Sequence, residues 1–148
     1  MRVNKFKIFL FIFLFIFTYL IYAGDVTYGN ISISSKNIVK VYDGDTFYCN
    51  IPNYPDIVGK NIGVRVYGID TPEIKGKTKH EKELALKAKT VTLCCLKNAK
   101  VIELKNMRRD KYFRILAEVY VDGKSLKDIL ITEKLGREYY GETKENWE

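Results

Sequence analysis

Two short acidic segments contain residues that could bind a metal ion. In the first, Asp45 follows an aspartate-glycine turn signal and begins a β-rich segment. In the second, Asp70 and Glu73 follow the end of another β-rich segment. If the two segments belong to one meander, Asp45 and Asp70 lie at the same end of the sheet and can converge. Two carboxylates and the backbone carbonyl of Thr71 are hard oxygen ligands, which suit Ca²⁺ with several waters.

Two arginines in β-rich segments could bind a phosphate group. Arg65 lies inside an otherwise apolar segment, and Arg114 ends the basic segment 108–114. A guanidinium group can hold a phosphate with two hydrogen bonds, which a lysine cannot do. Taken alone, each acidic segment is better explained by exposed loop carboxylates, and Arg65 by the solvent face of a strand. Taken together, a metal site, the further carboxylate Glu73 and two arginines are what cleavage of a phosphodiester needs.

Five short strands and two helices are expected to position these residues. Apolar periodicity predicts a helix over 81–98, with Leu84, Ala88, Val91 and Cys95 on its buried face. A second helix is predicted from the N-cap Ser125 to about residue 135. The element order is β-β-β-α-β-β-α, which predicts a mainly β chain with helices (α+β) and a five-stranded OB-fold barrel. The predicted strands are Ile38–Tyr42, Thr46–Ile51, Ile62–Ile69, Val101–Leu104 and Arg114–Val121.

The first 23 residues have the pattern of a secretory signal peptide. Three basic residues precede an uncharged block of 16 residues, Ile8–Ala23. This block is nearer to a signal-peptide core than to the ~20 residues of a membrane span. Ile21 is larger than the small residue that cleavage prefers at that position, so an uncleaved membrane anchor through residues 8–23 stays an alternative. Both alternatives place the domain outside the cytoplasm, either secreted, periplasmic or membrane-anchored.

Composition limits the rest of the chain to one domain. The chain has 25 basic and 18 acidic residues, and three basic residues precede Gly24. The remaining 125 residues therefore carry a net charge of +4 and correspond to about one domain. We expect a linker over 24–36 and the folded domain over 37–148. This disfavours a multidomain protein, a multipass membrane protein and a disulfide-stabilised miniprotein.

The cysteines predict neither a zinc site nor a disulfide framework. The chain has three cysteines and a single histidine, His80. An odd number leaves at least one thiol without a partner in the chain. We interpret the cysteines as apolar packing residues, while a Cys49–Cys95 bridge stays an alternative.

The motifs, in this order and spacing, resemble the staphylococcal nuclease (thermonuclease) family. The resemblance runs from about Asn37 to Trp147 and rests on these residues: Asp43-Gly44-Asp45-Thr46, Arg65, Asp70-Thr71-Pro72-Glu73, Asp110-Lys111-Tyr112-Phe113-Arg114 and Leu116-Ala117. It implies an OB-fold, Ca²⁺-dependent hydrolysis of DNA and RNA, and products that end in a 3′-phosphate. It implies no protein partner, and we expect a monomer.

The resemblance also implies a role for individual residues. Arg65, Glu73 and Arg114 match the catalytic residues, with Glu73 as the general base for the attacking water. The Ca²⁺ ligands would be Asp45, Asp70 and the Thr71 carbonyl, and the substrate-binding residues would be Lys111, Tyr112 and Tyr140. Asp43 would lie near the metal without binding it. Phe113 replaces a glycine that usually precedes the second arginine, so we expect it to crowd the pocket or to alter the approach of Arg114.

Three functions are compatible with these residues. The first is an extracytoplasmic Ca²⁺-dependent nuclease. The second is a catalytically weak or inactive OB-fold module that binds nucleic acid, and the third is an anchored structural or adaptor domain. Inactive relatives typically lack an essential acid or arginine, whereas this chain keeps all five such residues: Asp45, Arg65, Asp70, Glu73 and Arg114. The sequence therefore favours the enzyme.

Overall fold

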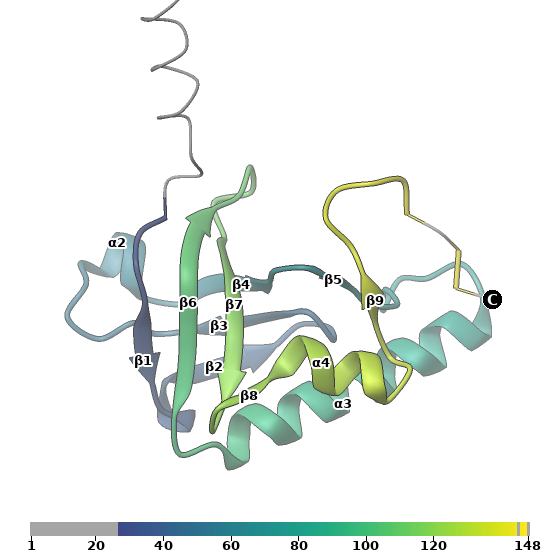
Figure 1. Cartoon of the computed structure of the whole chain (residues 1–148), viewed down its shortest axis with the longest axis horizontal. Helices are drawn as coiled ribbons and strands as arrows, with labels where there is room; N and C mark the ends of the chain where they lie inside the picture. Colours follow the sequence, from purple (N-terminus) through teal and green to yellow (C-terminus); the bar gives the residue numbers. More distant parts are fainter. Residues whose placement is uncertain (1–26, 145, 148) are drawn as a thin grey trace, which may run out of the picture.

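The computed structural model describes residues 27–144, 146 and 147. The predicted signal peptide or anchor lies outside the described residues. Within the described part of the chain, no helix is long and apolar enough to cross a membrane. Figure 1 shows a curled sheet with two helices packed along one side of it, so the chain has the predicted α+β class and a curled half-barrel sheet typical of an OB-fold.

The main sheet is built around an antiparallel meander. Strands β2, β3 and β4 pair in sequence, β4 pairs in parallel with β7, and β7 pairs with both β6 and β8. Strand β1 pairs with β6 at the edge. A separate two-stranded sheet joins β5 and β9. The strands are β1 Ile31–Ile33, β2 Ile38–Val41, β3 Thr46–Cys49, β4 Ile62–Val66, β5 Ile69–Asp70, β6 Ile102–Arg109, β7 Ile115–Val121, β8 Lys124–Ser125 and β9 Arg137–Glu138.

Side-chain alternation along the strands forms the core. In β7, residues 115, 117, 119 and 121 are buried and the intervening residues are half-buried, as period-2 alternation requires. Ile102 and Leu104 of β6, Phe47 of β3 and Val64 of β4 are fully buried with them. The five predicted strands are therefore the strands that carry the core.

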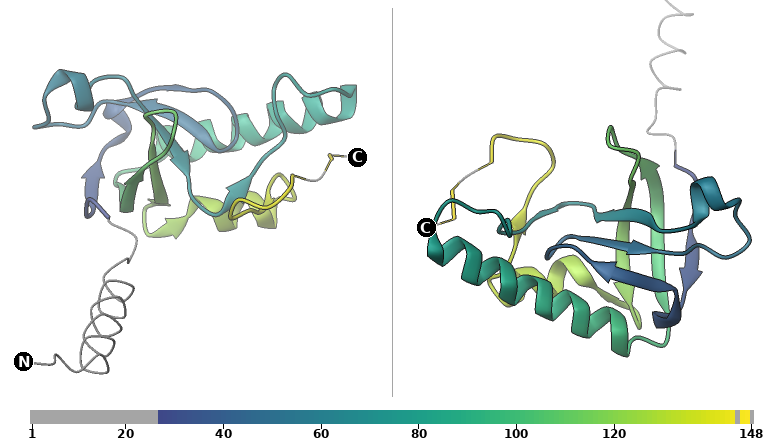
Figure 2. Two further views of the ribbon diagram at one scale, coloured as in Figure 1. Left: turned by 90° about the horizontal axis from the view of Figure 1, so that it is seen from above. Right: turned by 180° about the vertical axis from the view of Figure 1, so that it is seen from behind.

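Two helices close one side of the sheet, as the two views of Figure 2 also show. They are α3, Lys79–Asn98, and α4, Leu126–Thr132. Each begins at a hydroxyl N-cap: Thr78 accepts from the N–H of Glu81, and Ser125 accepts from that of Asp128. Two shorter helices also occur, the 3-10 turn η1, Ser35–Asn37, and α2, Asp56–Gly59.

The buried face of α3 differs from the predicted one. Its fully buried residues are Ala85, Ala88, Thr92 and Leu96. The predicted residues Leu84, Val91 and Cys95 pack against the core but are only partly buried. Because α3 contacts both β2 and α4, its buried face is wider and is turned by about one residue from the predicted stripe. The small side chain of Ala88 lies where the helix approaches the turn before β3.

Several predicted boundaries are wrong. The expected linker over 24–36 contains β1, which the polar surroundings of Ile31–Ile33 concealed; Ile33 is buried and pairs with Ile102 of β6. The short helix α2 lies before residue 62, and α3 begins at Lys79, two residues before the predicted start at residue 81. The strand predicted to end at Leu104 continues to Arg109. All three cysteines are free, so the Cys49–Cys95 bridge is absent.

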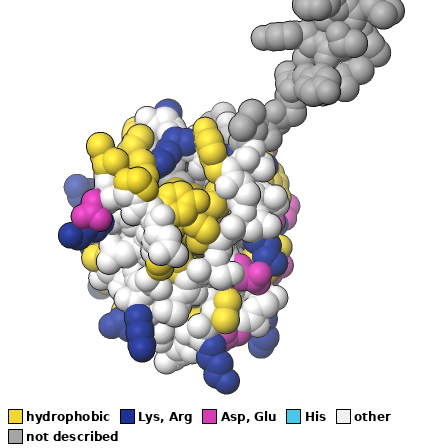
Figure 3. All heavy atoms as spheres, turned by 90° about the vertical axis from the view of Figure 1, so that its left-hand side faces the viewer, with side chains coloured by type: hydrophobic (Ala, Val, Ile, Leu, Met, Phe, Trp, Pro, Cys, Tyr) yellow, Lys and Arg dark blue, Asp and Glu magenta, His cyan; other side chains and the backbone are white. Residues whose placement is uncertain are grey.

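An apolar hollow lies on the side of the molecule that carries β1 and α2. Figure 3 shows hydrophobic side chains gathered on this face. The hollow has a volume of about 380 Å³, and its lining includes Tyr28, Tyr54, Val58 and Met107. It shares no lining residue with the larger cavity that contains Asp45 and Arg65.

Candidate active site

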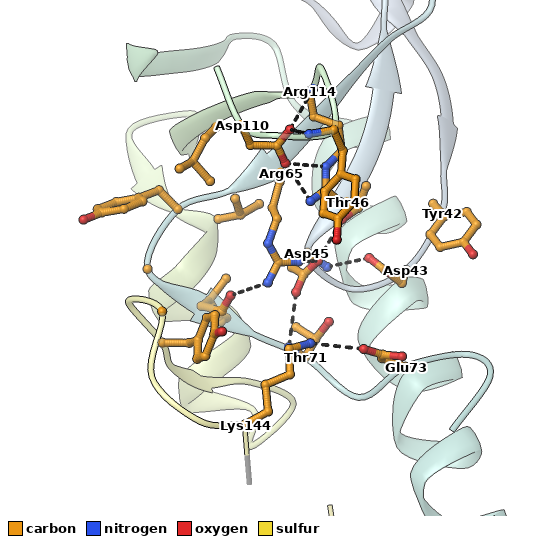
Figure 4. Close-up of a pocket in the computed structure, with 18 of the residues that line it drawn as sticks. Tyr42, Asp43, Asp45, Thr46, Arg65, Thr71, Glu73, Asp110, Arg114 and Lys144 are labelled. Atoms are coloured by element: carbon orange, nitrogen blue, oxygen red, sulfur yellow. Dashed lines mark hydrogen bonds and ion pairs between the residues drawn. The ribbon is translucent and has the colours of Figure 1, made fainter. Parts of the chain in front are cut away.

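A cavity of about 570 Å³ collects most of the residues singled out in the sequence. Its walls come from the turn before β3, from β4, from the segment between β5 and α3, from the β6–β7 turn and from the tail after β9 (Figure 4). Eight of the nine predicted site residues line it: Asp45, Arg65, Thr71, Glu73, Lys111, Tyr112, Arg114 and Tyr140. The ninth, Asp70, is 3% exposed and is held by residues of the cavity wall.

The turn before β3 holds Asp45 rigidly against α3. The Asp45 N–H donates to Oδ1 of Asp43 (3.2 Å), and the Thr92 hydroxyl of α3 donates to the carbonyl of Gly44 (2.6 Å). A Cβ at Gly44 would lie 2.7 Å from the Cβ of Ala88, so only glycine allows this close approach. The Asp45 carboxylate is 2% exposed and fixed in direction as a result.

Arg65 links the two buried carboxylates. In the antiparallel pair, Arg65 of β4 lies opposite Thr46 of β3, beside Asp45. Its Nη1 donates to Oδ1 of Asp45, and its Nη2 donates to the Ile69 carbonyl (3.2 Å) and lies 3.8 Å from Oδ1 of Asp70. The meander therefore brings the two acidic segments together, as the strand order predicted.

The surroundings of these carboxylates favour a bound cation. Asp45 Oδ2 accepts from the N–H of Thr71 (3.3 Å), which brings Thr71 next to the carboxylate. Burial, the largest cause, and the neighbouring negative charge of Asp45 together raise the pKa of Asp43 to about 7. A hard cation would reduce the repulsion between the neighbouring carboxylates of this buried turn. Two buried carboxylates and a neighbouring carbonyl therefore fit Ca²⁺, although within the described residues no three acidic, histidine or cysteine side chains cluster as a complete metal site.

Arg114 is positioned by Asp110 across the β6–β7 turn. Oδ1 of Asp110 accepts from the N–H groups of Tyr112 and Arg114, both at 2.9 Å, and its Oδ2 binds Nε and Nη2 of Arg114, both at 2.7 Å. Burial would raise the pKa of Asp110, but the hydrogen bonds from Arg114 and Tyr112 outweigh it and lower the pKa. Gly63 of β4 lets the Arg114 side chain cross the strand, since a Cβ there would lie 3.0 Å from Cγ of Arg114.

Phe113 lies outside the cavity. Its φ of +61° is in the left-handed region that a glycine adopts without strain. The residue is 57% exposed, and the centroid of its ring lies 4.2 Å from Cζ of the Arg109 guanidinium group. The expected crowding of the pocket is therefore wrong, because the backbone conformation turns the ring away from the lining.

Exposed aromatic side chains line the rim of the cavity. Tyr112 is 67% exposed, with the Lys111 ammonium 5.1 Å from its ring, and Tyr140 is 53% exposed. The rings of Tyr140 and Tyr67 pack edge-on, with their centroids 5.6 Å apart. Tyr140 therefore lies beside the pocket, at the position predicted from the sequence. Exposed rings next to basic groups are suited to stacking on bases and to holding phosphates.

Sequence reasoning missed one cation of the site, Lys144. Its Nζ lies 2.8 Å from Oδ1 of Asp70 and 3.1 Å from Oε1 of Glu73. Burial would lower the pKa of Lys144, but hydrogen bonds to Asp70 and Glu73 outweigh it and raise the pKa, so the group stays an ammonium. No local pattern identifies this residue, because it lies in a polar tail far along the chain from both acids.

Comparisons with known proteins agree with this geometry. A profile of the family described as "Staphylococcal nuclease homologue" matches residues 63–148. The chain is 39% identical over 114 residues to "Endonuclease YncB" of Bacillus subtilis (strain 168), which covers 74% of this chain and 46% of that protein. It is 36% identical over 114 residues to "SPbeta prophage-derived endonuclease YokF" of the same strain, covering 74% of this chain and 32% of that protein. The chain thus spans less than half the length of these two relatives.

Proposed function

This chain belongs to the staphylococcal nuclease family, and we propose on that basis that it is a Ca²⁺-dependent nuclease that hydrolyses phosphodiester bonds of DNA and RNA. The observation that carries the proposal is the convergence of the buried Asp45, two arginines and the exposed Glu73 on one cavity, with a second buried carboxylate, Asp70, bound to residues of its wall. The printed names of both relatives, endonucleases, support the same reaction class. The products would carry 3′-phosphate ends, as the family resemblance implies.

The two arginines would bind the phosphate and stabilise the charge that develops on it. Arg65 and Arg114 line the same cavity from β4 and from the turn before β7. Both guanidinium groups are held by carboxylates, Arg65 by Asp45 and Arg114 by Asp110. Donors that are fixed before the reaction stabilise developing negative charge without reorganisation in the transition state. This arrangement accounts for why arginine rather than lysine occupies both positions.

Asp45, Asp70 and the carbonyl of Thr71 would hold the Ca²⁺ ion, which when bound neutralises charge on the phosphate oxygens. Glu73 would act as the general base. Its side chain is 63% exposed at the cavity, so a water molecule can reach it. A carboxylate within hydrogen-bond reach of that water would accept its proton as the water attacks phosphorus. Lys111, Tyr112 and Tyr140 would bind the rest of the nucleotide at the rim.

A weak or inactive OB-fold module that binds nucleic acid is the alternative. It would use the same aromatic rim and basic residues but would not cleave. The presence of both arginines and all three acids favours the enzyme over this module. An anchored adaptor domain without metal dependence leaves the buried acids unexplained.

We also propose that the domain acts outside the cytoplasm, as a monomer. The proposed location is supported by the basic segment 2–7 and the uncharged block Ile8–Ala23 that follows it. Removal of residues 1–23 would give a secreted or periplasmic protein, and retention would leave it anchored through residues 8–23. The mass of the protein recovered from membrane and soluble fractions distinguishes the two.

The test is cleavage by the full chain, kept in a non-ionic detergent at low salt. Denatured DNA and RNA are incubated with Ca²⁺ or with a chelator, and the product ends are identified by mass spectrometry. We expect cleavage with Ca²⁺ alone, with 3′-phosphate ends. Binding without cleavage under Ca²⁺ would establish the module instead, and cleavage in the chelator would refute the metal requirement.

A further inference from the structure

The tail after β9 brings a lysine onto the proposed metal ligands. Lys144 Nζ contacts Oδ1 of Asp70 at 2.8 Å and Oε1 of Glu73 at 3.1 Å, and both acids belong to the segment that follows β4. Figure 4 shows Lys144 pointing toward Glu73. The Asp70 side chain is 4% exposed and that of Lys144 is 44% exposed. A surface ammonium therefore reaches inward to neutralise a buried carboxylate.

Contacts on both sides of Lys144 hold the tail in place. On one side, the N–H of Tyr140 donates to Oε2 of Glu142 at 2.8 Å, and the Lys144 ammonium lies 5.9 Å from the Tyr139 ring. On the other side, Arg137 of β9 donates to the Asn146 carbonyl at 3.0 Å and stacks over the Trp147 ring at 3.7 Å. The position of Lys144 is thus built into the fold of the tail.

We infer that Lys144 is an internal cation that competes with Ca²⁺ for Asp70 and so sets the metal affinity of the site. This inference rests on the proposed function, since it takes Asp70 as a Ca²⁺ ligand. A Ca²⁺ ion binds a carboxylate oxygen at 2.3–2.6 Å, and the ammonium already lies 2.8 Å from Oδ1 of Asp70. Two cations at such distances from one oxygen repel each other strongly. The ion therefore binds Asp70 only when Lys144 moves away.

With competition of this kind, the apparent affinity for Ca²⁺ equals the intrinsic affinity multiplied by the fraction of molecules in which Asp70 is available. If Lys144 is bound to Asp70 in about 90% of molecules, the apparent Kd for Ca²⁺ rises roughly tenfold. Without metal, the same contact at 2.8 Å, together with Nη2 of Arg65 at 3.8 Å, compensates the charge of the buried acid. Lys144 thus stabilises the metal-free protein and weakens metal binding.

The experiment measures Ca²⁺ binding directly, without nucleic acid. Isothermal titration calorimetry is performed with CaCl₂ on the full chain in detergent and on Lys144→Gln, Trp147→Ala and Lys75→Gln. Lys75 lines the same cavity, and among the described residues the structure shows it in no ion pair with Asp70 or Glu73, so its variant controls for the loss of one positive charge.

We expect Lys144→Gln to bind Ca²⁺ roughly tenfold more tightly than the unmodified chain. Trp147→Ala should shift the affinity in the same direction by releasing the tail, and Lys75→Gln should stay within about twofold. Equal affinities of Lys144→Gln and Lys75→Gln, or weaker binding by Lys144→Gln, would overturn the inference while leaving the Ca²⁺ site intact. Absence of Ca²⁺ binding in every protein would instead refute the metal site of the proposed function, and the inference with it.

Discussion

Arg65 donates a hydrogen bond through Nη1 to Oδ1 of Asp45, so a proposed phosphate-binding group and a proposed metal ligand are bound to each other. The pair crosses from β4 to the start of β3, and the side chains are 17% and 3% exposed. Each group compensates the charge of the other in a site that excludes most water. The pair fixes the direction of both groups before metal or substrate arrives.

Replacing either proposed catalytic arginine by lysine should slow cleavage strongly. Arg65→Lys and Arg114→Lys keep the positive charge but lose the forked donor, and we expect kcat to fall by roughly 10²-fold or more. Single-turnover cleavage of an oligonucleotide measures this. Arg109→Lys is the matched control, because Arg109 stacks on Phe113 outside the cavity and should keep its rate within about threefold. Equal rates in all three variants would remove the arginines from the mechanism.

Asp110→Asn should lower stability in a pH-dependent way. The folded-state pKa of Asp110 is below its ordinary value of 3.8, so its ionised form stabilises the fold above about pH 4 and that contribution is lost as pH falls through the folded pKa. We expect the free energy of unfolding to fall by about 1 kcal/mol at pH 7, because the hydrogen bonds to Arg114 become weaker. The loss is no larger because these groups are partly exposed to solvent. The difference should shrink as the pH falls through the lowered folded-state pKa of Asp110. Urea unfolding at several pH values measures it, and a loss that is independent of pH would contradict this reasoning.

Phe113→Gly should stabilise the protein. At a φ of +61° a side chain costs about 1–2 kcal/mol that glycine avoids, while the exposed stacking on Arg109 contributes only about 0.5–1 kcal/mol. We expect a gain of up to about 1 kcal/mol, seen as a higher Tm, with unchanged cleavage. Phe113→Ala is the control, since it loses the ring and keeps the strain. If the glycine variant were no more stable than the alanine variant, backbone strain would not be the cause.

The cysteines should differ in reactivity. Burial raises the pKa of Cys49 to about 12, and its side chain is fully buried, whereas Cys94 is exposed. Since the thiolate is the reactive form, iodoacetamide at pH 8 should modify Cys94 in the native protein and Cys49 only after denaturation. Peptide mass spectrometry with and without denaturant reads this out. Modification of native Cys49 would show that the core around β3 opens.

The strands that carry the core could be predicted because each contains a short apolar or alternating run. The edge strand β1 could not, because three residues in a polar segment give too weak a pattern and gain their order only from pairing with β6. The buried face of α3 differs from the predicted face by about one residue for a related reason. Contacts with both β2 and α4 decide which side chains are covered, and these contacts are not encoded in local periodicity.

More of the candidate site than of the element boundaries could be predicted from the sequence. Asp45 directly precedes β3, Arg65 lies in the neighbouring strand β4, and Asp70 lies in β5, which follows β4 along the chain. The strand order therefore brings the three residues together. Lys144 is different, because its contact with Asp70 depends on how the tail returns after β9. The orientation of Phe113 likewise follows from a positive φ that its residue type does not suggest.

The most direct test of the proposed nuclease compares binding and cleavage in Glu73→Gln. A labelled single-stranded oligonucleotide is incubated with the unmodified full chain and with the variant in saturating Ca²⁺; anisotropy gives Kd and single-turnover kinetics give the cleavage rate. If Glu73 is the general base at this cavity, the variant should bind within about twofold and cleave roughly 10²–10⁴-fold more slowly. Cleavage by the variant at the unmodified rate would contradict the assignment of this cavity as the active site.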